Sequence, residues 1–492
     1  MRMKDIFKKI SVFRIASMIK TGKLETLFLI IFLVFGIITV FLIPPGWNTD
    51  EPDHTYRIYQ LSKGNLFSEP VLSPAGNKAY GGEVASGLVN LYKDAGVRDA
   101  GASAADKTKK ANGLYDAHPN ILKYKDDGSK TSINFSGAAL YSPVTYALYI
   151  PIFKVGTMLH SPFLVILIIA RLVGLLAVGL AFFLAIRHIK AGKWIIFVIG
   201  LLPVTVIQAA SVGADGPLLG VAVLFLMYIT NIVYSSKQPT TRNYVILAFL
   251  GMLLTFVKLA YAPLTLLILV IPFIKKTPIS KRVVITALAA TLIAIIPNLI
   301  WTTMVSYVDT NSNLQSNFPM QKSFILHEPI LYIKTLYYTF FTNEQAPLDA
   351  LFGNAVWNSV PLPAFFSYLA MTAVVLSVGV KNSREDVMRS MKSRGPIIWK
   401  LALLVASSIT ILIISTALYI YSSTLYQSSI IGLQARYFIP LLPVILLACV
   451  GNYFKNQKNV KIIIVCLSVI ILLGATFALY HRLYQTLPIL LR

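Results

Sequence analysis

Eleven apolar runs constrain what this chain can fold into more than any other feature of its sequence. A helix that crosses the hydrocarbon core of a bilayer needs about 20 predominantly apolar residues. The runs cover residues 26–43, 163–186, 194–211, 217–235, 243–257, 259–274, 283–303, 362–380, 399–421, 437–453 and 462–480. Apolar residues make up 56% of the chain and charged residues 13%, whereas soluble domains have about 45–50% and about 25%. We therefore expect an all-α integral membrane protein with about 11 transmembrane helices over residues 26–480, and not a soluble enzyme or a disordered scaffold.

Almost all of the net charge of +24 lies in the segments that join alternate runs. These segments hold 25 basic and four acidic residues, and they are 1–25, 187–193, 237–242, 275–282, 381–400 and 455–461. Cytoplasmic loops of membrane proteins are enriched in Lys and Arg. The pattern therefore predicts a cytoplasmic N-terminus, eleven crossings and a short outer tail at 481–492. Because the charge reports topology and the chain has no nucleic-acid-binding motif, we expect no nucleic-acid partner.

Four segments are expected to lie outside the hydrocarbon core. Residues 1–25 form a basic amphipathic segment of the kind that lies on a membrane surface. Two large outer loops span 44–138 and 304–361, and we expect juxtamembrane helices in both. Residues 139–159 are apolar, but a crossing there would place a basic loop outside, so we interpret them as an interfacial helix. The part of the first loop at 71–135 lacks apolar periodicity, which favours a mobile segment over a domain.

The segment directly after the first apolar run carries the densest set of polar side chains, at 48–54, followed by Arg57. One interpretation is a helix start, with Thr49 or the residue before it as the N-cap and acids in the first turn. The other is a functional site, because such a start presents Asp50 and Glu51 side by side, with His54 and Arg57 further along. A carboxylate, an imidazole and a guanidinium on one face form an acid/base and anion-binding set. Both interpretations stay open from composition alone.

Three ionisable residues sit at or inside the apolar runs. Asp215 lies between the third and fourth runs, where it could cap the fourth helix or belong to a site. Lys258 lies at the tip of a hairpin of two short runs, and an ionisable residue at such depth suggests a functional role with an anionic partner. A lipid headgroup could also be that partner. Arg171, inside the second run, is open to an internal pairing or to a role in function.

The tenth run opens with Gln434, Ala435, Arg436 and Tyr437. Arginine suits phosphate because its guanidinium is planar and always charged. Arginine and tyrosine are also common anchors at a membrane interface. The sequence leaves both interpretations open for Arg436.

Three stretches carry a resemblance to a known family: PPGWNTDEPDHTYRIYQLSKG at 44–64, GADGPLLG at 213–220 and QARYFIPLLP at 434–443. They resemble a family of bacterial multi-span proteins long catalogued only as a domain of unknown function. Its overall plan is similar to the GT-C superfamily of membrane glycosyltransferases. The resemblance covers roughly residues 25–480, and its first and third motifs are the more specific ones.

The resemblance implies a fold, a reaction and a set of residues. GT-C enzymes take a sugar from a polyprenyl-phosphate carrier at the outer face of the membrane, with an essential acid in the first outer loop, where Asp50 and Glu51 lie. It implies phosphate or substrate contacts for the other polar residues, which are His54, Arg57, Asp215, Lys258, Gln434, Arg436 and Tyr437. Some members use a divalent metal such as Mg²⁺ or Mn²⁺, which Asp50, Glu51 and Asp215 would hold. The expected acceptor is an envelope polysaccharide or a teichoic-acid-like polymer, at the bacterial cytoplasmic membrane and among its lipids.

Two other functions compete with this one. A ligase or polymerase of lipid-linked glycans shares the chemistry and the location, and the sequence does not separate it cleanly. A lipid-linked glycan transporter or flippase would also have many spans and an embedded lysine. A transporter, however, needs polar residues along a path to the inner side, whereas the polar clusters of this chain gather on one predicted face.

Overall fold

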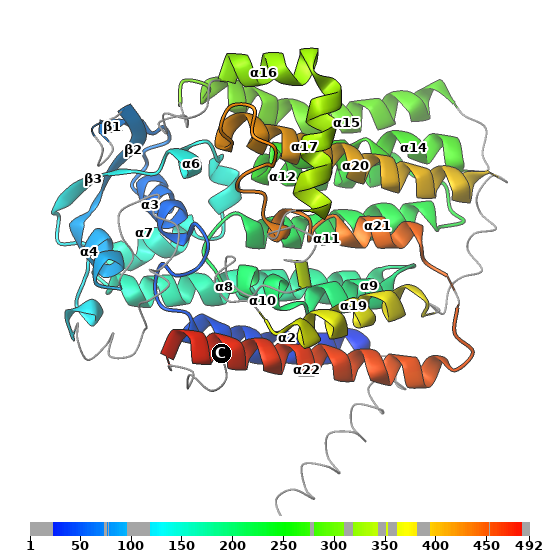
Figure 1. Ribbon diagram of the computed structural model, residues 1–492, viewed down its shortest axis with the longest axis horizontal. Helices are drawn as coiled ribbons and strands as arrows, with labels where there is room; N and C mark the ends of the chain where they lie inside the picture. The colour runs from blue at the N-terminus through cyan, green and yellow to red at the C-terminus, as the bar shows by residue number, and fades with distance from the viewer. Residues whose placement is uncertain are drawn as a thin grey trace, which may run out of the picture.

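The computed structural model describes residues 23–72, 76, 78–95, 119–275, 280–308, 318–342, 351–352, 362–380, 394–451 and 453–484. The predicted basic segment at 1–25 lies outside these ranges except for residues 23–25, and the predicted tail at 481–492 lies outside them after residue 484. The described chain is mostly helical, and its apolar helices run side by side along one direction (Figure 1).

Six helices are long and apolar enough to cross a membrane. They are α2 (Leu24–Leu42), α8 (Phe163–His188), α11 (Asp215–Val233), α15 (Lys281–Met304), α20 (Gly395–Ser422) and α22 (Gln457–Tyr484). Each coincides with one of the predicted runs. The chain is therefore a multi-pass membrane protein, as its apolar pattern predicts.

The other five predicted runs hold shorter or interrupted helices, so the number of crossings stays a prediction. Their elements are α9 (Lys193–Gly200), α10 (Pro203–Ala209), α12 (Thr241–Val257), η3 (Leu259–Tyr261), α13 (Ala262–Thr265), α14 (Leu267–Ile274), α19 (Ala364–Val378), η6 (Ala435–Tyr437) and α21 (Leu442–Ala448). Proline accounts for several of the breaks, because it lacks the N–H that continues a helix and restricts the residue before it. Pro203 and Pro443, for example, each stand at the beginning of a new short helix.

The segment predicted as one interfacial helix at 139–159 is divided into short pieces. They are α6 (Ser136–Ala139), η2 (Pro143–Tyr146) and α7 (Ile150–Met158). At 1.5 Å per residue, none of them could cross a core of about 30 Å. Val155, Met158 and Leu159 are nevertheless exposed on or next to α7, as expected of a helix that rests against lipid.

A small ordered unit follows α3 (Glu51–Ser62) and corrects the prediction of a mobile segment at 71–135 for the residues described there, whereas 73–75, 77 and 96–118 lie outside the described residues. Its elements are β1 (Glu69–Leu72), β2 (Lys78–Ala85), α4 (Ser86–Asp94), η1 (Pro119–Leu122) and β3 (Lys130–Asn134). The strands form an antiparallel sheet in the order β1-β2-β3, at one end of the apolar helices (Figure 1). A Cβ on Gly81 would lie 1.8 Å from the Ile133 carbonyl oxygen, so this pairing requires glycine. The strands escaped prediction because they are short and lack a regular apolar alternation.

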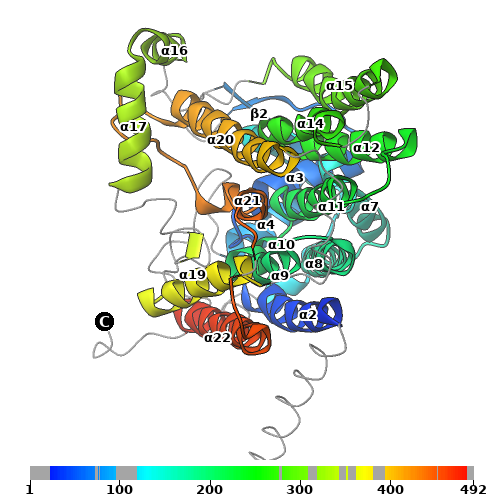
Figure 2. The same cartoon turned by 90° about the vertical axis from the view of Figure 1, so that its right-hand side faces the viewer.

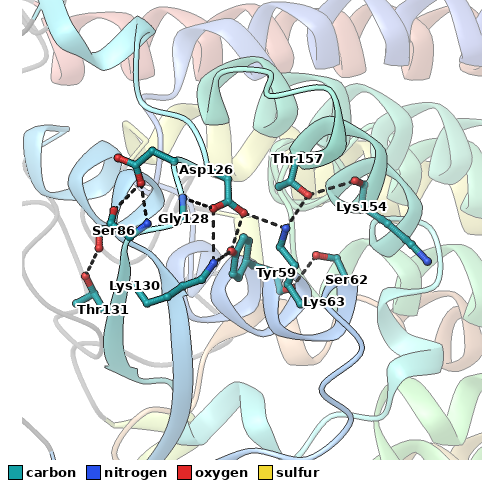
Figure 3. A network of polar contacts seen from close by, with 12 residues as sticks. Tyr59, Ser62, Lys63, Ser86, Asp126, Gly128, Lys130, Thr131, Lys154 and Thr157 are labelled. Carbon is teal, nitrogen blue, oxygen red and sulfur yellow. Dashed lines mark hydrogen bonds and ion pairs between the residues drawn. The ribbon is translucent and has the colours of Figure 1, made fainter.

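A polar network fastens this unit to the helices around it (Figure 3). The Asp126 carboxylate is nearly buried and accepts a hydrogen bond from the Tyr59 hydroxyl at 2.8 Å. It also forms an ion pair with the Lys63 ammonium at 2.9 Å. Lys63 also donates to the Thr157 hydroxyl in α7 at 3.1 Å. Burial alone would raise the pKa of Asp126, but the bonds from Lys63 and Tyr59 lower it to about 2. The carboxylate therefore stays charged and ties α3 to the loop before β3.

Helices α16 (Phe318–His327) and α17 (Pro329–Phe341) occupy the predicted loop 304–361. α17 runs across the direction of the long helices and stands at the side of the bundle (Figure 2). Its Thr339 hydroxyl accepts a hydrogen bond from the Ile430 amide at 2.9 Å, and Phe340 packs against Phe438 with ring centroids 5.8 Å apart. The helix therefore supports the segment that leads to η6.

Two apolar cores meet between the membrane helices and the sheet unit. The larger core includes residues of α2, α8, α11 and α20, and the smaller one joins α3, the sheet, η2 and the start of α8. Tyr141 is half-buried and packs against both cores. The polar residues that the sequence singled out lie close to this junction.

Candidate functional site

Helix α3 begins with a backbone feature that frees the Asp50 carboxylate. Asp50 is the residue before the first helical turn, with φ of 55° in the left-handed region, and its side chain makes no capping hydrogen bond. Only a few per cent of residues other than glycine adopt a positive φ, and Asp and Asn are enriched among them. The helix start expected with Thr49 or Asn48 as N-cap is therefore shifted to Asp50. Its carboxylate bonds to Arg436 instead of to its own helix.

The neighbouring Glu51 faces the opposite way and is fully buried. Its carboxylate accepts two hydrogen bonds from Arg171, one from the Gly46 amide at 3.0 Å and one from the Val212 amide at 3.2 Å. The remaining N–H groups of Arg171 donate hydrogen bonds to the carbonyls of Val40, Ile43 and Pro44, at the end of α2. All five N–H groups of a guanidinium are thereby used. Glu51 and Arg171 hold together α2, the start of α3 and the loop before α11.

Four residues that are far apart in sequence form one ion-pair cluster. Arg436 donates to Asp50 at 2.6 Å and to Asp215 at 2.8 Å, and Lys258 donates to the other oxygen of Asp215 at 2.6 Å. We call Asp50, Asp215, Lys258 and Arg436 the ion-pair cluster. The sequence placed all four on one predicted face, and the structure brings them into direct contact.

Short breaks in helices present these side chains. Asp215 is the first residue of α11, preceded by a bend. Lys258 is the extended residue that ends α12, with φ of −151° and ψ of 111°. Arg436 lies in the short helix η6, which precedes Pro440 and α21. The Tyr261 hydroxyl donates to the Tyr437 carbonyl at 2.6 Å and so joins the segment after Lys258 to the one that carries Arg436.

The members of the cluster differ in their access to solvent. The Asp50 side chain is 40% exposed, whereas those of Asp215, Lys258 and Arg436 are 12%, 15% and 7% exposed. The Arg436 Nε is buried and has no hydrogen-bond partner in the described part of the chain. Two cations and two carboxylates give the cluster no net charge. Asp50 is therefore the member of the cluster that a ligand can reach most easily, and the Arg436 Nε–H has no partner among the described residues.

Tyr437 covers the cations of the cluster. Its ring lies 4.8 Å from the Lys258 ammonium and 5.1 Å from the Arg436 guanidinium carbon, as in cation–π contacts. Its hydroxyl accepts a long hydrogen bond from Arg436 at 3.3 Å. An aromatic face of this kind holds two cations close together without adding a negative charge.

His54 lies behind Asp50, on the side of η2. Its Nδ1 and the Tyr146 hydroxyl are 2.6 Å apart, and its ring meets the Tyr141 ring edge-on at 5.3 Å. Burial lowers the pKa of His54 to about 4, against the opposite effect of the Asp50 and Asp215 carboxylates. The imidazole is therefore neutral at physiological pH and acts as a hydrogen-bonding group, not as a cation for phosphate.

Asp53, one turn after Asp50, is an acid that the sequence analysis did not single out. It is half-buried, and its side chain makes no hydrogen bond or ion pair with the residues that the structure describes. Burial and the Asp50 carboxylate raise the pKa of Asp53 to about 7. Its position three residues after Asp50 on a helix places the two on neighbouring parts of the surface.

Two other predicted residues stay apart from the cluster. Arg57 is fully buried and donates to Gln60, Ser68 and the Leu66 carbonyl, so its guanidinium supports the loop after α3. Gln434 is half-buried, and its carbonyl accepts the first backbone bond of η6 from Tyr437 at 3.1 Å. Neither side chain bonds to a member of the ion-pair cluster within the described ranges.

The three carboxylates expected to hold a divalent metal do not fit such a site. Glu51 gives its oxygens to Arg171 and two amides, and the Arg436 guanidinium separates Asp50 from Asp215. A metal site needs several oxygen or nitrogen ligands that converge on one point. No group of three or more His, Cys, Asp or Glu side chains with that arrangement occurs among the described residues.

The comparison with protein families covers most of the chain. The family model described as "Predicted membrane protein (DUF2142)" matches residues 33–445. The chain belongs to the DUF2142 family. All four residues of the ion-pair cluster lie within the matched range. A comparison with curated proteins finds no match for this chain.

Two residues of this DUF2142 protein near the cluster, Tyr141 and Tyr146, also escaped the sequence analysis. They flank the turn Ser142-Pro143 in a stretch that we interpreted as an interfacial helix, where tyrosine is common. The sequence offered one signal for these two tyrosines, because Pro143 interrupts the apolar pattern between them. A break next to a predicted site marks a segment that can carry side chains into it.

Proposed function

We propose that this protein is a GT-C-type membrane glycosyltransferase. It would transfer a sugar from a polyprenyl-phosphate donor to an envelope polysaccharide or teichoic-acid-like acceptor, at the outer face of the bacterial cytoplasmic membrane. The observation that carries the proposal is the ion-pair cluster, in which two nearly buried cations adjoin one exposed carboxylate. A phosphate leaving group needs the cations, and an attacking hydroxyl needs the carboxylate.

The charge balance of the cluster suggests how a donor would enter. As built, the cluster is neutral, so it offers no net attraction to a phosphate. Asp50 is the most exposed acid and is held by Arg436 alone, whereas Asp215 is held by both cations. A phosphate that replaced Asp50 on Arg436 would meet a net charge of +1 from Arg436, Lys258 and Asp215. The exchange would also release the Asp50 carboxylate.

The released carboxylate is the proposed general base. Once Arg436 no longer occupies it, its oxygen is open to a hydrogen bond from the acceptor hydroxyl. The acceptor hydroxyl would attack the anomeric carbon, its proton would pass to Asp50, and the bond from that carbon to the phosphate oxygen would break. The electron pair would remain on the phosphate beside Arg436 and Lys258. Attack opposite the leaving group inverts the configuration.

The proposed role of Glu51 differs from that of its neighbour. Its bonds to Arg171, Gly46 and Val212 hold the residues that precede both Asp50 and Asp215. Because every lone pair that faces the protein is occupied, Glu51 is better suited to positioning than to proton transfer. His54, which is neutral and pairs with Tyr146, likewise has a positioning role in this proposal.

The decisive experiment measures sugar transfer by the purified protein in nanodiscs. The donors are polyprenyl phosphates that carry radiolabelled hexose, N-acetylhexosamine or pentose, and the acceptor is envelope glycan isolated from cells that lack the protein. We expect one donor to yield labelled glycan and free polyprenyl phosphate. The chemistry of the cluster predicts that a chelator such as EDTA leaves this rate unchanged.

Matched variants test the residue roles within this proposal. Arg436→Ala should abolish transfer, whereas Arg242→Ala, an exposed arginine at the start of α12, should not. If neither Arg436→Ala nor Arg242→Ala turned over the donor, the proposal would be contradicted. Loss of transfer in Asp53→Asn with full transfer in Asp50→Asn would keep the reaction and move the base to Asp53.

A further inference from the structure

Two hydrogen bonds hold the segment that carries Tyr141, yet the Tyr141 hydroxyl has no hydrogen-bond partner among the residues that the structure describes. The Trp301 indole donates to the Leu140 carbonyl at 2.9 Å, and the Thr145 hydroxyl donates to the Phe256 carbonyl at 3.1 Å. The second bond attaches the turn to Phe256, which lies two residues before Lys258. A rigid segment beside the ion-pair cluster therefore presents a phenol to it.

Support for the ring itself comes from α3. His54 meets the Tyr141 ring edge-on, and its Nδ1 pairs with Tyr146, at the other end of the turn. The Tyr141 hydroxyl makes no hydrogen bond within the described ranges, and the side chain is only half-buried. Buried polar groups in proteins are nearly always hydrogen-bonded. A fixed, accessible hydroxyl close to the Lys258 ammonium, with no partner among the described residues, is thus a candidate contact for a ligand.

The groups around this hydroxyl decide which ligand atom it suits. Burial raises the pKa of Tyr141, and the Lys258 ammonium acts in the opposite direction. The carboxylates of Asp215 and Asp50 and the phenol of Tyr437 add to the increase. The hydroxyl therefore stays protonated at physiological pH and can donate to an anionic oxygen.

We propose that the Tyr141 hydroxyl donates a hydrogen bond to the phosphate of the lipid-linked donor, next to Arg436 and Lys258. This inference rests on the proposed function, because it assigns the third donor of the same phosphate site. The Arg436 Nε, which has no partner among the described residues, the Lys258 ammonium and the Tyr141 hydroxyl would then approach the phosphate from three segments. Tyr141 becomes a substrate-binding residue that helps to distinguish a prenyl phosphate from a prenyl alcohol.

The test measures binding, so that it does not depend on knowing the sugar. The probe is farnesyl phosphate, with farnesol as its uncharged counterpart, titrated into the full-length protein in nanodiscs. We expect the wild type to bind the phosphate more tightly than the alcohol. Tyr141→Phe should weaken phosphate binding about 10-fold to 100-fold, as for the loss of a hydrogen bond to a charged group, and leave farnesol binding unchanged.

Tyr149→Phe is the matched control. Tyr149 lies in the same segment, but its hydroxyl is fully buried and has no hydrogen-bond partner among the described residues. Its removal should not affect the preference for phosphate. If Tyr141→Phe retained the wild-type preference while Arg436→Ala lost it, the inference about Tyr141 would be wrong and the phosphate site would stand. No preference in the wild type would overturn both.

A second measurement needs no substitution at position 141. A farnesyl phosphate analogue with a diazirine beside the phosphate is photolysed on the wild-type protein, and the labelled peptide is identified by mass spectrometry. We expect label on the peptide that contains Tyr141, and competition by unmodified farnesyl phosphate. Label confined to peptides distant from the ion-pair cluster would contradict the inference even if Tyr141→Phe failed to accumulate.

Discussion

Arg171 and Arg436 each bind a carboxylate at the start of α3, but the protein uses their donors differently. Arg171 is saturated, because Glu51 and three carbonyls take all five of its N–H groups. Arg436 shares its guanidinium between two acids, one of them 40% exposed, and its Nε has no partner in the described chain. A saturated arginine stabilises a fold, whereas one with spare donors can accept a ligand.

The two acids that these arginines bind are adjacent in sequence, yet they differ in the same way. Glu51 lies inside the protein and joins three segments, while Asp50 lies at the surface of the cluster with a left-handed backbone. The left-handed residue turns the chain sharply just before α3. Two neighbouring carboxylates thereby reach different surroundings, one closed and one open.

The largest expected effect tests the closed site. Arg171→Ala would leave Glu51 buried without its cation, a change that costs about 3–5 kcal/mol in other proteins. We expect little folded protein, measured by size-exclusion profile and thermal unfolding after membrane extraction. Arg187→Ala, a basic residue near the end of the same helix α8, serves as the control and should accumulate normally. Normal stability of Arg171→Ala would remove the distinction between the two arginines.

A smaller effect on stability, with a large one on activity, is expected at the open site. Arg436→Lys keeps one positive charge but cannot bridge Asp50 and Asp215 with a fork. We predict normal accumulation and a transfer rate about 10²–10³-fold lower, the range seen when one stabilising donor is removed. The measurement is transfer at saturating and subsaturating donor. A variant with normal donor dependence would make Arg436 a structural residue like Arg171.

The smallest effect concerns an ion pair that belongs to neither site. Asp126→Asn weakens the bonds to Lys63 and Tyr59 (Figure 3), at a cost of roughly 1 kcal/mol or less because both lysine partners are partly exposed. The folded-state pKa of Asp126 is about 2, below the ordinary value of 3.8. Its stabilisation is therefore complete above about pH 4 and is lost as the pH falls toward 2.

Thermal unfolding between pH 7 and pH 2.5 tests this assignment. The difference in stability between the wild type and Asp126→Asn should shrink as the pH falls below 4. Transfer at pH 7 should stay within about twofold of the wild type. A constant difference across this range would show that the network in Figure 3 does not depend on the charge of Asp126.

Most of the candidate site could be predicted from the sequence, because charged residues are rare beside apolar runs. Asp215, Lys258 and Arg436 stood out for that reason, and the charge of the loops placed them on one face. The apolar runs likewise predicted the positions of the six long helices. A charged residue is costly to place beside an apolar run, so its position in the sequence alone indicates a candidate site.

Other features depend on contacts between distant segments, which local patterns do not contain. The roles of Asp50 and Glu51 separate only when Arg171 and Arg436 are placed in space. The sheet around Gly81 has strands too short for a clear alternation, and Tyr141 resembles an ordinary interfacial aromatic. Prolines inside the apolar runs also marked breaks that we interpreted as continuous spans.

The most direct test of the account compares Asp50→Asn with Glu51→Gln in thermal stability and in sugar transfer, at matched amounts of folded protein. Asparagine accepts the left-handed backbone at position 50, so Asp50→Asn should unfold within about 0.5 kcal/mol of the wild type. Its transfer should fall about 10²–10⁴-fold, as for loss of a general base. Glu51→Gln should be clearly less stable, yet its folded fraction should retain transfer. Near-normal transfer by Asp50→Asn, or a stable and inactive Glu51→Gln, would contradict the division between an open and a closed site.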